Sequence, residues 1–357
     1  MPTVVITGAN RGIGLEAAAQ FARSGRFSTV ILTVRSADKG PAAVAAAATA
    51  SGRPASLFTF QALDLEDHAS VRAAIAALPD RLDALVLNAG GLGGTRLTAH
   101  GVTVNFAQNV LGHAVLTEGL LAAGKLGAGA KVIYSHSETT RSVWLFTGMQ
   151  PFVRLAVEDI EGSIARPPTR GSYGVPVRGR MNAYANSKLI GGLWLRQLAE
   201  EHPGIYFASV SPGGVATDVY ADAPQPLPFL MSQPIVIKMF LMLRGCHPVE
   251  AAAERYVTAV TDETFKERFP SGSVLGGPSG FPNYGATGPL VDQGEYSSYY
   301  YDAALQKEAA RVVRLAAAVP HSDAKRTDAE QALFNSSDLL DTALLAMVIG
   351  ACAHFFF

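Results

Sequence analysis

The sequence "TGANRGIG", residues 7–14, decides the fold, because it joins a β-branched run at residues 3–7 to a helix-like segment at residues 12–24. Its three glycines permit a tight turn in which backbone amides approach a pyrophosphate at the N-terminus of the helix. The spacing is Gly-x3-Gly-x-Gly and no Gly-Lys-Ser follows, which excludes a P-loop. A glycine-rich turn can also be purely structural, so the rest of the chain has to decide between these two interpretations.

Short apolar runs alternate with helix-like segments over the first two-thirds of the chain. Further runs lie at residues 29–34, 56–63, 84–90, 131–137 and 205–212. Runs of this length are typical of strands buried on both faces of a parallel sheet. Further helix-like segments lie at residues 66–78, 100–123 and 183–201. Repeated βα units of this kind predict an α/β fold with a doubly wound parallel sheet of the Rossmann type.

The composition excludes several functional classes. A formal net charge of −1 and the lack of a basic run argue against nucleic-acid binding. Cys246 and Cys352 lie far apart and the histidines are scattered, so neither a disulfide framework nor a metal site is predicted. The N-terminus enters a strand at once and shows no signal-peptide pattern. We therefore expect a reducing, cytoplasmic location.

The C-terminal region differs from the rest. We expect one domain over residues 1–318, followed by a polar link and an apolar tail over residues 319–357. The last sixteen residues, 342–357, are almost wholly apolar. A membrane-spanning helix needs about 20 residues. Two interpretations stay open: membrane association through residues 338–357, or a helix that caps a core or a partner surface.

Two arginines bear on the choice of cofactor. An NAD site predicts an acidic residue about 20 residues after the glycine turn, at the end of the second strand. The sequence there is "LTVRSADKG", with Arg35 and no adjacent carboxylate, and Arg11 lies inside the glycine turn. Guanidinium groups suit the 2′-phosphate of NADP. NADP(H) is therefore predicted, and the alternative is that both arginines are solvated surface residues.

A tyrosine and a lysine lie four residues apart in "YANSK", residues 184–188. On a helix, Tyr184 and Lys188 share one face, one turn from each other. The positive charge of the lysine can lower the pKa of the phenol from its ordinary value of about 10. The alternative is an ordinary amphipathic helix with solvated polar residues.

Six motifs in order resemble the short-chain dehydrogenase/reductase family. They are "TGANRGIG" (7–14), "DL" (64–65), "NAG" (88–90), "NVLGH" (109–113), "YANSK" (184–188) and "PGGVAT" (212–217). The run at residues 101–117 and "SE" at residues 137–138 are most similar to the retinol dehydrogenase and WW-domain oxidoreductase branch. The resemblance implies a seven-stranded parallel sheet whose last strand is residues 271–277.

The resemblance implies four catalytic residues. Tyr184 is similar to the acid/base that protonates the carbonyl oxygen, and Lys188 to the residue that holds the nicotinamide ribose and tunes the phenol. Ser137 is similar to the serine that binds the substrate oxygen. Asn109 is similar to the asparagine whose helix kink holds a proton-relay water, or else it is a helix-interior polar group bonded to solvent.

The serine assignment has a competitor, and the cofactor wall follows from the same resemblance. His136 replaces the first serine of the usual pair, which leaves Ser135 as a second candidate. Strand alternation turns His136 away from Ser137, so a packed structural histidine is expected. The implied cofactor-binding residues are Gly8, Asn10, Arg11, Gly12, Ile13, Gly14, Arg35, Asp64, Leu65, Asn88, Gly90, Tyr184, Lys188, Pro212, Gly213 and Thr217.

Two departures from the family pattern concern the substrate and assembly. A 46-residue gap separates Ser137 from Tyr184, which leaves the oligomeric state open. A substrate lid is expected around residues 221–248, where residues 225–243 carry a single charge, on Lys238. A lipophilic small-molecule substrate fits this segment, and ordinary core packing is the alternative.

These observations predict an NADP-dependent oxidoreductase that interconverts a lipophilic aldehyde or ketone and its alcohol. The alternative is a catalytically idle dinucleotide-binding regulatory or scaffold protein.

Overall fold

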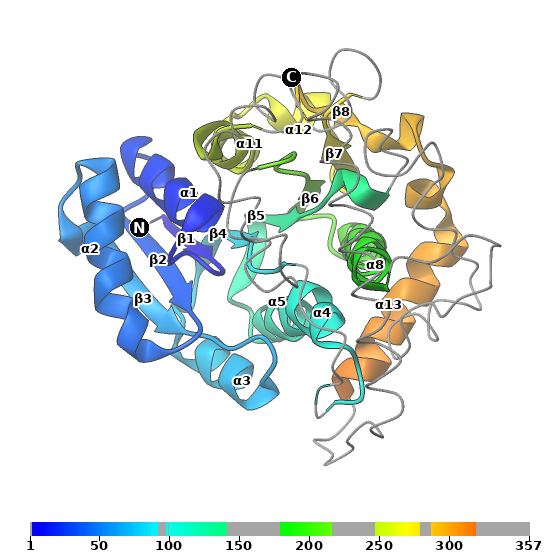
Figure 1. The fold of residues 1–357 in the computed structure, drawn as a ribbon, viewed down its shortest axis with the longest axis horizontal. Coiled ribbons are helices and arrows are strands. Elements are labelled where there is room, and N and C mark those ends of the chain that lie inside the picture. The colour runs from blue at the N-terminus through cyan, green and yellow to red at the C-terminus, as the bar shows by residue number, and fades with distance from the viewer. Residues whose placement is uncertain are drawn as a thin grey trace, which may run out of the picture.

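The computed structural model describes residues 2–91, 98, 100–140, 179–215, 247–278 and 287–318. Within these residues, eight strands form one sheet in the order β3-β2-β1-β4-β5-β6-β7-β8 (Figure 1). The strands are β1 (Thr3–Ile6), β2 (Thr29–Val34), β3 (Phe58–Ala62), β4 (Leu82–Leu87), β5 (Leu126–Ser135), β6 (Tyr206–Val210), β7 (Ser273–Gly276) and β8 (Val291–Asp292).

The sheet is parallel from β3 through β7, and only β8 runs antiparallel to its neighbour. The predicted α/β fold with a doubly wound parallel sheet is confirmed, and the predicted last strand at residues 271–277 contains β7. The seven expected parallel strands are present, and β8 adds an antiparallel edge strand that was not expected. This strand has two residues, too few to give an alternating pattern that sequence inspection could detect.

Helices cover both faces of the sheet (Figure 1). They are α1 (Gly12–Arg23), α2 (Gly40–Ser51), α3 (His68–Ala77), α4 (Val104–Phe106), a π-helix (Ala107–Leu111), α5 (Gly112–Ala122), α8 (Gly179–Glu201), α11 (Val249–Thr261), α12 (Phe265–Arg268) and α13 (Ala303–Ala318). Short 3-10 helices lie at Ala37–Lys39, Ala55–Leu57, Glu138–Thr140, Gln293–Glu295 and Ser298–Tyr301.

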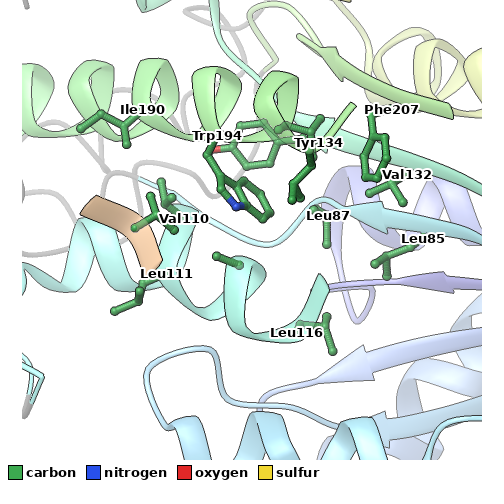
Figure 2. Close-up of a cluster of buried hydrophobic side chains, with 14 of the residues drawn as sticks. Leu85, Leu87, Val110, Leu111, Leu116, Val132, Tyr134, Ile190, Trp194 and Phe207 are labelled. Carbon is green, nitrogen blue, oxygen red and sulfur yellow. The ribbon is translucent and has the colours of Figure 1, made fainter. Parts of the chain in front are cut away.

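Two hydrophobic cores result from this layering. Helices α1, α2, α11 and α12 pack on one face of the sheet, and α3, α5, α8 and α13 pack on the other. Figure 2 shows part of the second core, where Tyr134 of β5 and Trp194 of α8 lie between the helix and the sheet. Because both faces are covered, the central strands are predominantly apolar, which explains their runs in the sequence.

The helix expected at residues 100–123 is interrupted. It consists of α4, the π-helix and α5, and it begins at Val104. The strand expected at residues 131–137 begins earlier, at Leu126, and ends at Ser135, so that Ser137 lies in the loop beyond it. The first difference places Asn109 in the π-helix, and the second places Ser137 in a loop at the end of β5.

Several predictions lie outside the described residues. These are the lid up to residue 246, Thr217, most of the segment between Ser137 and Tyr184, and residues 319–357. Among the helices that are described, none combines the length and the apolar character needed to cross a membrane.

Candidate active site

Many of the predicted site residues follow the carboxyl ends of neighbouring strands, from Arg35 after β2 and Asp64 after β3 to Pro212 after β6. The glycine turn follows β1, the segment containing Asn88 and Gly90 follows β4, Ser137 follows β5, and Pro212 follows β6. The chain order reverses between β1 and β4, where ligands bind in open α/β sheets. One edge of the sheet therefore carries the predicted residues, although they are far apart in sequence.

The glycine turn is closely packed against the segment after β4. Gly8 has a φ of +65°, in the left-handed region that favours glycine. A Cβ atom on Gly14 would lie 2.5 Å from the carbonyl oxygen of Gly8 and 2.6 Å from Nδ2 of Asn88. That amide nitrogen also donates to the carbonyl oxygen of Thr7 at 2.9 Å. The turn thus leads into the N-terminus of α1 with no space for a side chain at Gly14.

The predicted adenosine side of the site is open to solvent. Arg11 and Arg35 are both exposed, and Nη2 of Arg35 lies 4.0 Å from Oε1 of Glu66. Asp64 is half-buried, and its carboxylate accepts the backbone N–H of Glu66 at 3.0 Å. Leu65 is buried in the core. Both arginines therefore lie where a ligand could reach them.

Two further cofactor-wall predictions belong to the glycine turn and to α1. Asn10 lies in the turn and is half-buried. Ile13 is on the first turn of α1 and packs partly against the core. Gly12, the first residue of α1, has a φ of +55°.

The side chain of Asn109 clamps the segment after β4. Asn109 lies in the π-helix and is fully buried. Its Nδ2 donates to the carbonyl oxygens of Gly91 and Asn105, both at 2.8 Å, and its Oδ1 accepts the N–H of Gly91 at 3.1 Å. A Cβ atom on Gly90 would lie 2.3 Å from Oδ1 of Asn109. The alternative of a solvent-bonded asparagine was wrong, and π-helices occur frequently at functional sites.

A buried histidine links Asn109 to the glycine turn. Nδ1 of His113 lies 3.3 Å from the carbonyl oxygen of Asn109. Because a carbonyl oxygen only accepts, Nδ1 carries the proton, and Nε2 accepts from the hydroxyl of Thr7 at 3.0 Å. Burial lowers the pKa of His113 to about 3, so the ring is neutral. The hydroxyl of Tyr134 also donates to the Asn109 carbonyl, at 3.0 Å.

Neither His113 nor Tyr134 was predicted as a site residue. The position of His113 four residues after Asn109, on the same helix face, was the available signal. Tyr134 gave no comparable signal, because its partner lies on another element.

Lys188 is buried beside Tyr184 on α8. Only 2% of Lys188 is exposed, which excludes a solvated face at this position. Its Nζ lies 5.7 Å from the ring centroid of Tyr184 and donates to the carbonyl oxygen of Ser135 at 2.8 Å. A Cβ atom on Gly90 would lie 3.6 Å from this nitrogen. The lysine therefore lies between α8, the end of β5 and the segment that Asn109 clamps.

The charge of Lys188 is sensitive to pH near neutrality. Burial disfavours the ammonium and lowers the pKa of Lys188 to about 7. The ammonium is therefore much easier to deprotonate than that of an exposed lysine. A strongly perturbed pKa at the edge of a ligand-binding fold is typical of a functional group.

The two candidate serines face different surroundings. The hydroxyl of Ser135 accepts from Tyr256 of α11 at 2.7 Å, on the face of the sheet opposite α8. Ser137 lies beyond the strand, is half-buried, and accepts from the hydroxyl of Thr139 at 3.0 Å. Ser137 therefore remains the better candidate for the substrate-binding serine.

His136 is a packed structural residue, as predicted. Only 1% of it is exposed. Its Nε2 lies 3.1 Å from the hydroxyl of Thr140 and 3.3 Å from that of Tyr300.

The segment after β6 continues the same edge. Pro212 and Gly213 are half-buried, and Gly213 has a φ of +82°. The hydroxyl of Ser211 accepts the N–H of Gly213 at 3.2 Å, which forms a tight turn. Thr217, the last predicted residue of this segment, lies outside the described residues.

Comparison with known proteins gives relatives of one kind. A family model described as short chain dehydrogenase matches residues 2–149. The short chain dehydrogenase sol3 of Alternaria solani is 32% identical over 240 residues, which cover 63% of this chain and 75% of the relative. Dehydrogenase/reductase SDR family member 13 of Bos taurus is 33% identical over 226 residues, covering 61% of this chain and 52% of the relative.

Two other comparisons agree with these. Retinol dehydrogenase 12 of Homo sapiens is 32% identical over 222 residues, covering 60% of this chain and 62% of the relative. A crystal structure of an uncharacterized protein from Mycobacterium paratuberculosis has the same fold, with a TM-score of 0.60, 24% identity, and coverage of 90% of this chain and 95% of that chain. The chain spans about half the length of the Bos taurus relative.

The identity to sol3 over three-quarters of that relative agrees with the sheet order and with the glycine turn at its switch point. The chain belongs to the short-chain dehydrogenase/reductase family.

Proposed function

We propose that the protein is an NADP-dependent oxidoreductase that interconverts a lipophilic aldehyde or ketone and its alcohol by hydride transfer. The observation that carries this proposal is Lys188, a buried lysine with a pKa of about 7, beside Tyr184. Burying an ammonium opposes folding, so a lysine at this position is best explained by the chemistry that it supports.

The edge of the sheet fits a dinucleotide. The glycine turn leaves no space for a side chain at Gly14, so a pyrophosphate can approach the backbone amides at the N-terminus of α1. Arg11 and Arg35 would hold the 2′-phosphate, and Asp64 would lie near the adenine. When bound, NADPH supplies the hydride that reduces the carbonyl carbon.

The residues of the chain would supply the proton and the orientation. The Ser137 hydroxyl would donate a hydrogen bond to the substrate oxygen, and the Tyr184 phenol would give that oxygen its proton. The positive charge of Lys188 favours the phenolate that remains. In alcohol oxidation, the same phenolate would accept the proton. Asn109 and His113 would hold Gly90 and Gly91 in place beneath this group.

A lipophilic substrate is the finer part of the proposal. It is supported by the apolar segment at residues 225–243 and by the similarity to retinol dehydrogenase 12. The segment lies outside the described residues, so its contribution to this argument is its sequence.

A panel of lipophilic aldehydes and ketones tests the function. The purified protein is expected to oxidise NADPH in the presence of at least one of them. Tyr184→Phe should bind NADPH normally and lose turnover. Tyr206→Phe is the matched control, because its hydroxyl donates to the carbonyl oxygen of Phe269 at the opposite end of the sheet. NADPH binding without turnover on the whole panel would favour the idle regulatory protein. Turnover that Tyr184→Phe leaves unchanged would contradict the catalytic assignment.

A further inference from the structure

A buried ion pair lies next to the proposed site and has no part in the chemistry described above. Glu138 directly follows Ser137 and is only 6% exposed, and Arg255 of α11 is 7% exposed. Nη1 of Arg255 lies 3.6 Å from Oε1 of Glu138. A buried pair of this kind is weak evidence for stability, because well-packed apolar residues often serve equally well. Its contacts with the surrounding loops are therefore more informative.

The carboxylate of Glu138 joins the ends of three adjacent strands. Glu138 itself begins the 3-10 helix after β5. The backbone N–H of Gly277, just after β7, donates to Oε1 at 2.9 Å. The hydroxyl of Ser211, just after β6, donates to Oε2. One carboxylate thus fixes the loop that carries Ser137 to the two loops beside it.

The guanidinium of Arg255 bonds to the same Ser211 segment and to the residues before β8. Its Nη1 donates to the carbonyl oxygen of Ser211 at 2.8 Å, and its Nη2 donates to that of Gly288 at 2.8 Å. Nη2 also lies 2.9 Å from Nε2 of His247. Arginine only donates, so Nε2 accepts and His247 is neutral with its proton on Nδ1. The N–H of His247 donates in turn to the carbonyl oxygen of Gly214 at 2.6 Å.

The segment 211–214 is therefore held at both ends. Ser211 is bonded directly to both members of the ion pair, and Gly214 is bonded to Arg255 through His247. Pro212 and Gly213 lie between these two points. In the proposed reaction, this segment would contact the nicotinamide and Ser137 would contact the substrate carbonyl. A rigid connection between them fixes the distance over which the hydride would move.

We propose that Glu138 and Arg255 are positioning residues for hydride transfer, which set the Ser137 loop against the segment 211–214. The inference rests on the proposed function. A displacement of about 1 Å in a reacting geometry can lower a rate about 100-fold. The pair would thus contribute to kcat through Ser137 and Pro212, without contact with the reacting atoms.

The first test is Glu138→Gln, which keeps an oxygen for the N–H of Gly277 and removes the charge. We expect kcat to fall by about 10- to 100-fold, while the KM for NADPH changes by less than about threefold because the glycine turn is unaffected. Glu118→Gln is the control, because Glu118 of α5 also pairs with an arginine, Arg314 of α13, at a half-exposed place between helices. The control should leave kcat unchanged.

Two further variants separate positioning from stability. Glu138→Leu combined with Arg255→Met leaves no unpaired buried charge, so its melting temperature should return toward that of the wild type. Its kcat should stay low, because the bonds to Ser211 and Gly277 are gone. Ser211→Ala removes the two bonds of one hydroxyl, to Glu138 and from the N–H of Gly213, and leaves the ion pair in place, so it should lower kcat with little change in melting temperature. Recovery of kcat together with the melting temperature would overturn the proposal, as would an unchanged kcat in Ser211→Ala and Glu138→Gln.

Fluorescence of bound NADPH gives a readout that does not need turnover. Emission from the nicotinamide reports on how rigidly the segment 211–214 holds it, so Glu138→Gln should bind NADPH with emission nearer that of the free cofactor. An unchanged emission would contradict the positioning role even if no substrate is found. A wild-type protein that binds NADPH but reduces no carbonyl would contradict the proposed function only. The emission of bound NADPH would still test the positioning role of the ion pair.

Discussion

Replacement of Lys188 with methionine is expected to stabilise the cofactor-free protein while it abolishes activity. The pKa of Lys188 falls from its ordinary value of 10.5 to about 7 because the ammonium is buried. Between these two values, the unfolded chain binds a proton that the folded site releases, so the free energy of unfolding rises with pH. From these pKa values, burial of the Lys188 ammonium lowers the free energy of unfolding by about 4 kcal/mol at pH 7 and by about 2 kcal/mol at pH 9.

The methionine variant removes this cost and also one hydrogen bond. Loss of the bond from Nζ to the carbonyl oxygen of Ser135 costs about 1 kcal/mol. The free energy of unfolding of Lys188→Met should therefore exceed that of the wild type by about 3 kcal/mol at pH 7 and by about 1 kcal/mol at pH 9. Methionine is chosen because it is unbranched and apolar and fits an irregular core.

Urea denaturation without cofactor, followed by tryptophan fluorescence, measures the difference. Trp194 is fully buried on α8 and reports unfolding of the relevant core. Lys266→Met on α12 is the control, because Lys266 is exposed and its replacement should change the free energy of unfolding little. A Lys188→Met protein less stable than the wild type at pH 7 would refute the reasoning. So would a difference that stays constant between pH 7 and pH 9.

Three further predictions concern the cofactor wall and the π-helix. Arg35→Ala should weaken NADPH binding by about tenfold or more and leave NADH binding unchanged, as measured by fluorescence titration; equal losses for both cofactors would contradict the 2′-phosphate assignment. Gly14→Ala should abolish dinucleotide binding, because its Cβ would lie 2.5 Å from the Gly8 carbonyl oxygen; a variant that titrates like the wild type would contradict the tight turn. His113→Phe should lower the free energy of unfolding by about 1–3 kcal/mol, because the Asn109 carbonyl and the Thr7 hydroxyl lose a buried partner; a variant as stable as the wild type in urea would show that this link is not needed.

The fold was largely predictable because the sheet is covered on both faces. Residues 29–34 form β2 as expected, since a strand buried on both sides is predominantly apolar and β-branched. The helix α2 was missed, because its alanine-rich sequence has no clear polar face. The π-helix was also beyond prediction from periodicity, because it depends on Asn109 bonding to Gly91 in a distant segment.

The site was predictable where spacing along one element decides it. Tyr184 and Lys188 lie one turn apart, and this is evident from the sequence. The burial of Lys188 and its bond to Ser135 depend on β5, which lies far away in the chain. The pair of Glu138 and Arg255 was missed for the same reason, since nothing in the sequence links the "SE" motif at residues 137–138 to an arginine more than a hundred residues later.

The central claim is that Tyr184 gives a proton to a carbonyl oxygen while NADPH reduces the adjacent carbon. Its most direct test uses NADPH with deuterium at both positions on C4 of the nicotinamide, the best carbonyl substrate of the panel, and mass spectrometry of the alcohol. Wild-type protein should place one deuterium on the former carbonyl carbon, and Tyr184→Phe should form this product at least about 100-fold more slowly with NADPH still bound. Unlabelled alcohol from the wild type, or labelled alcohol from Tyr184→Phe at the wild-type rate, would contradict it.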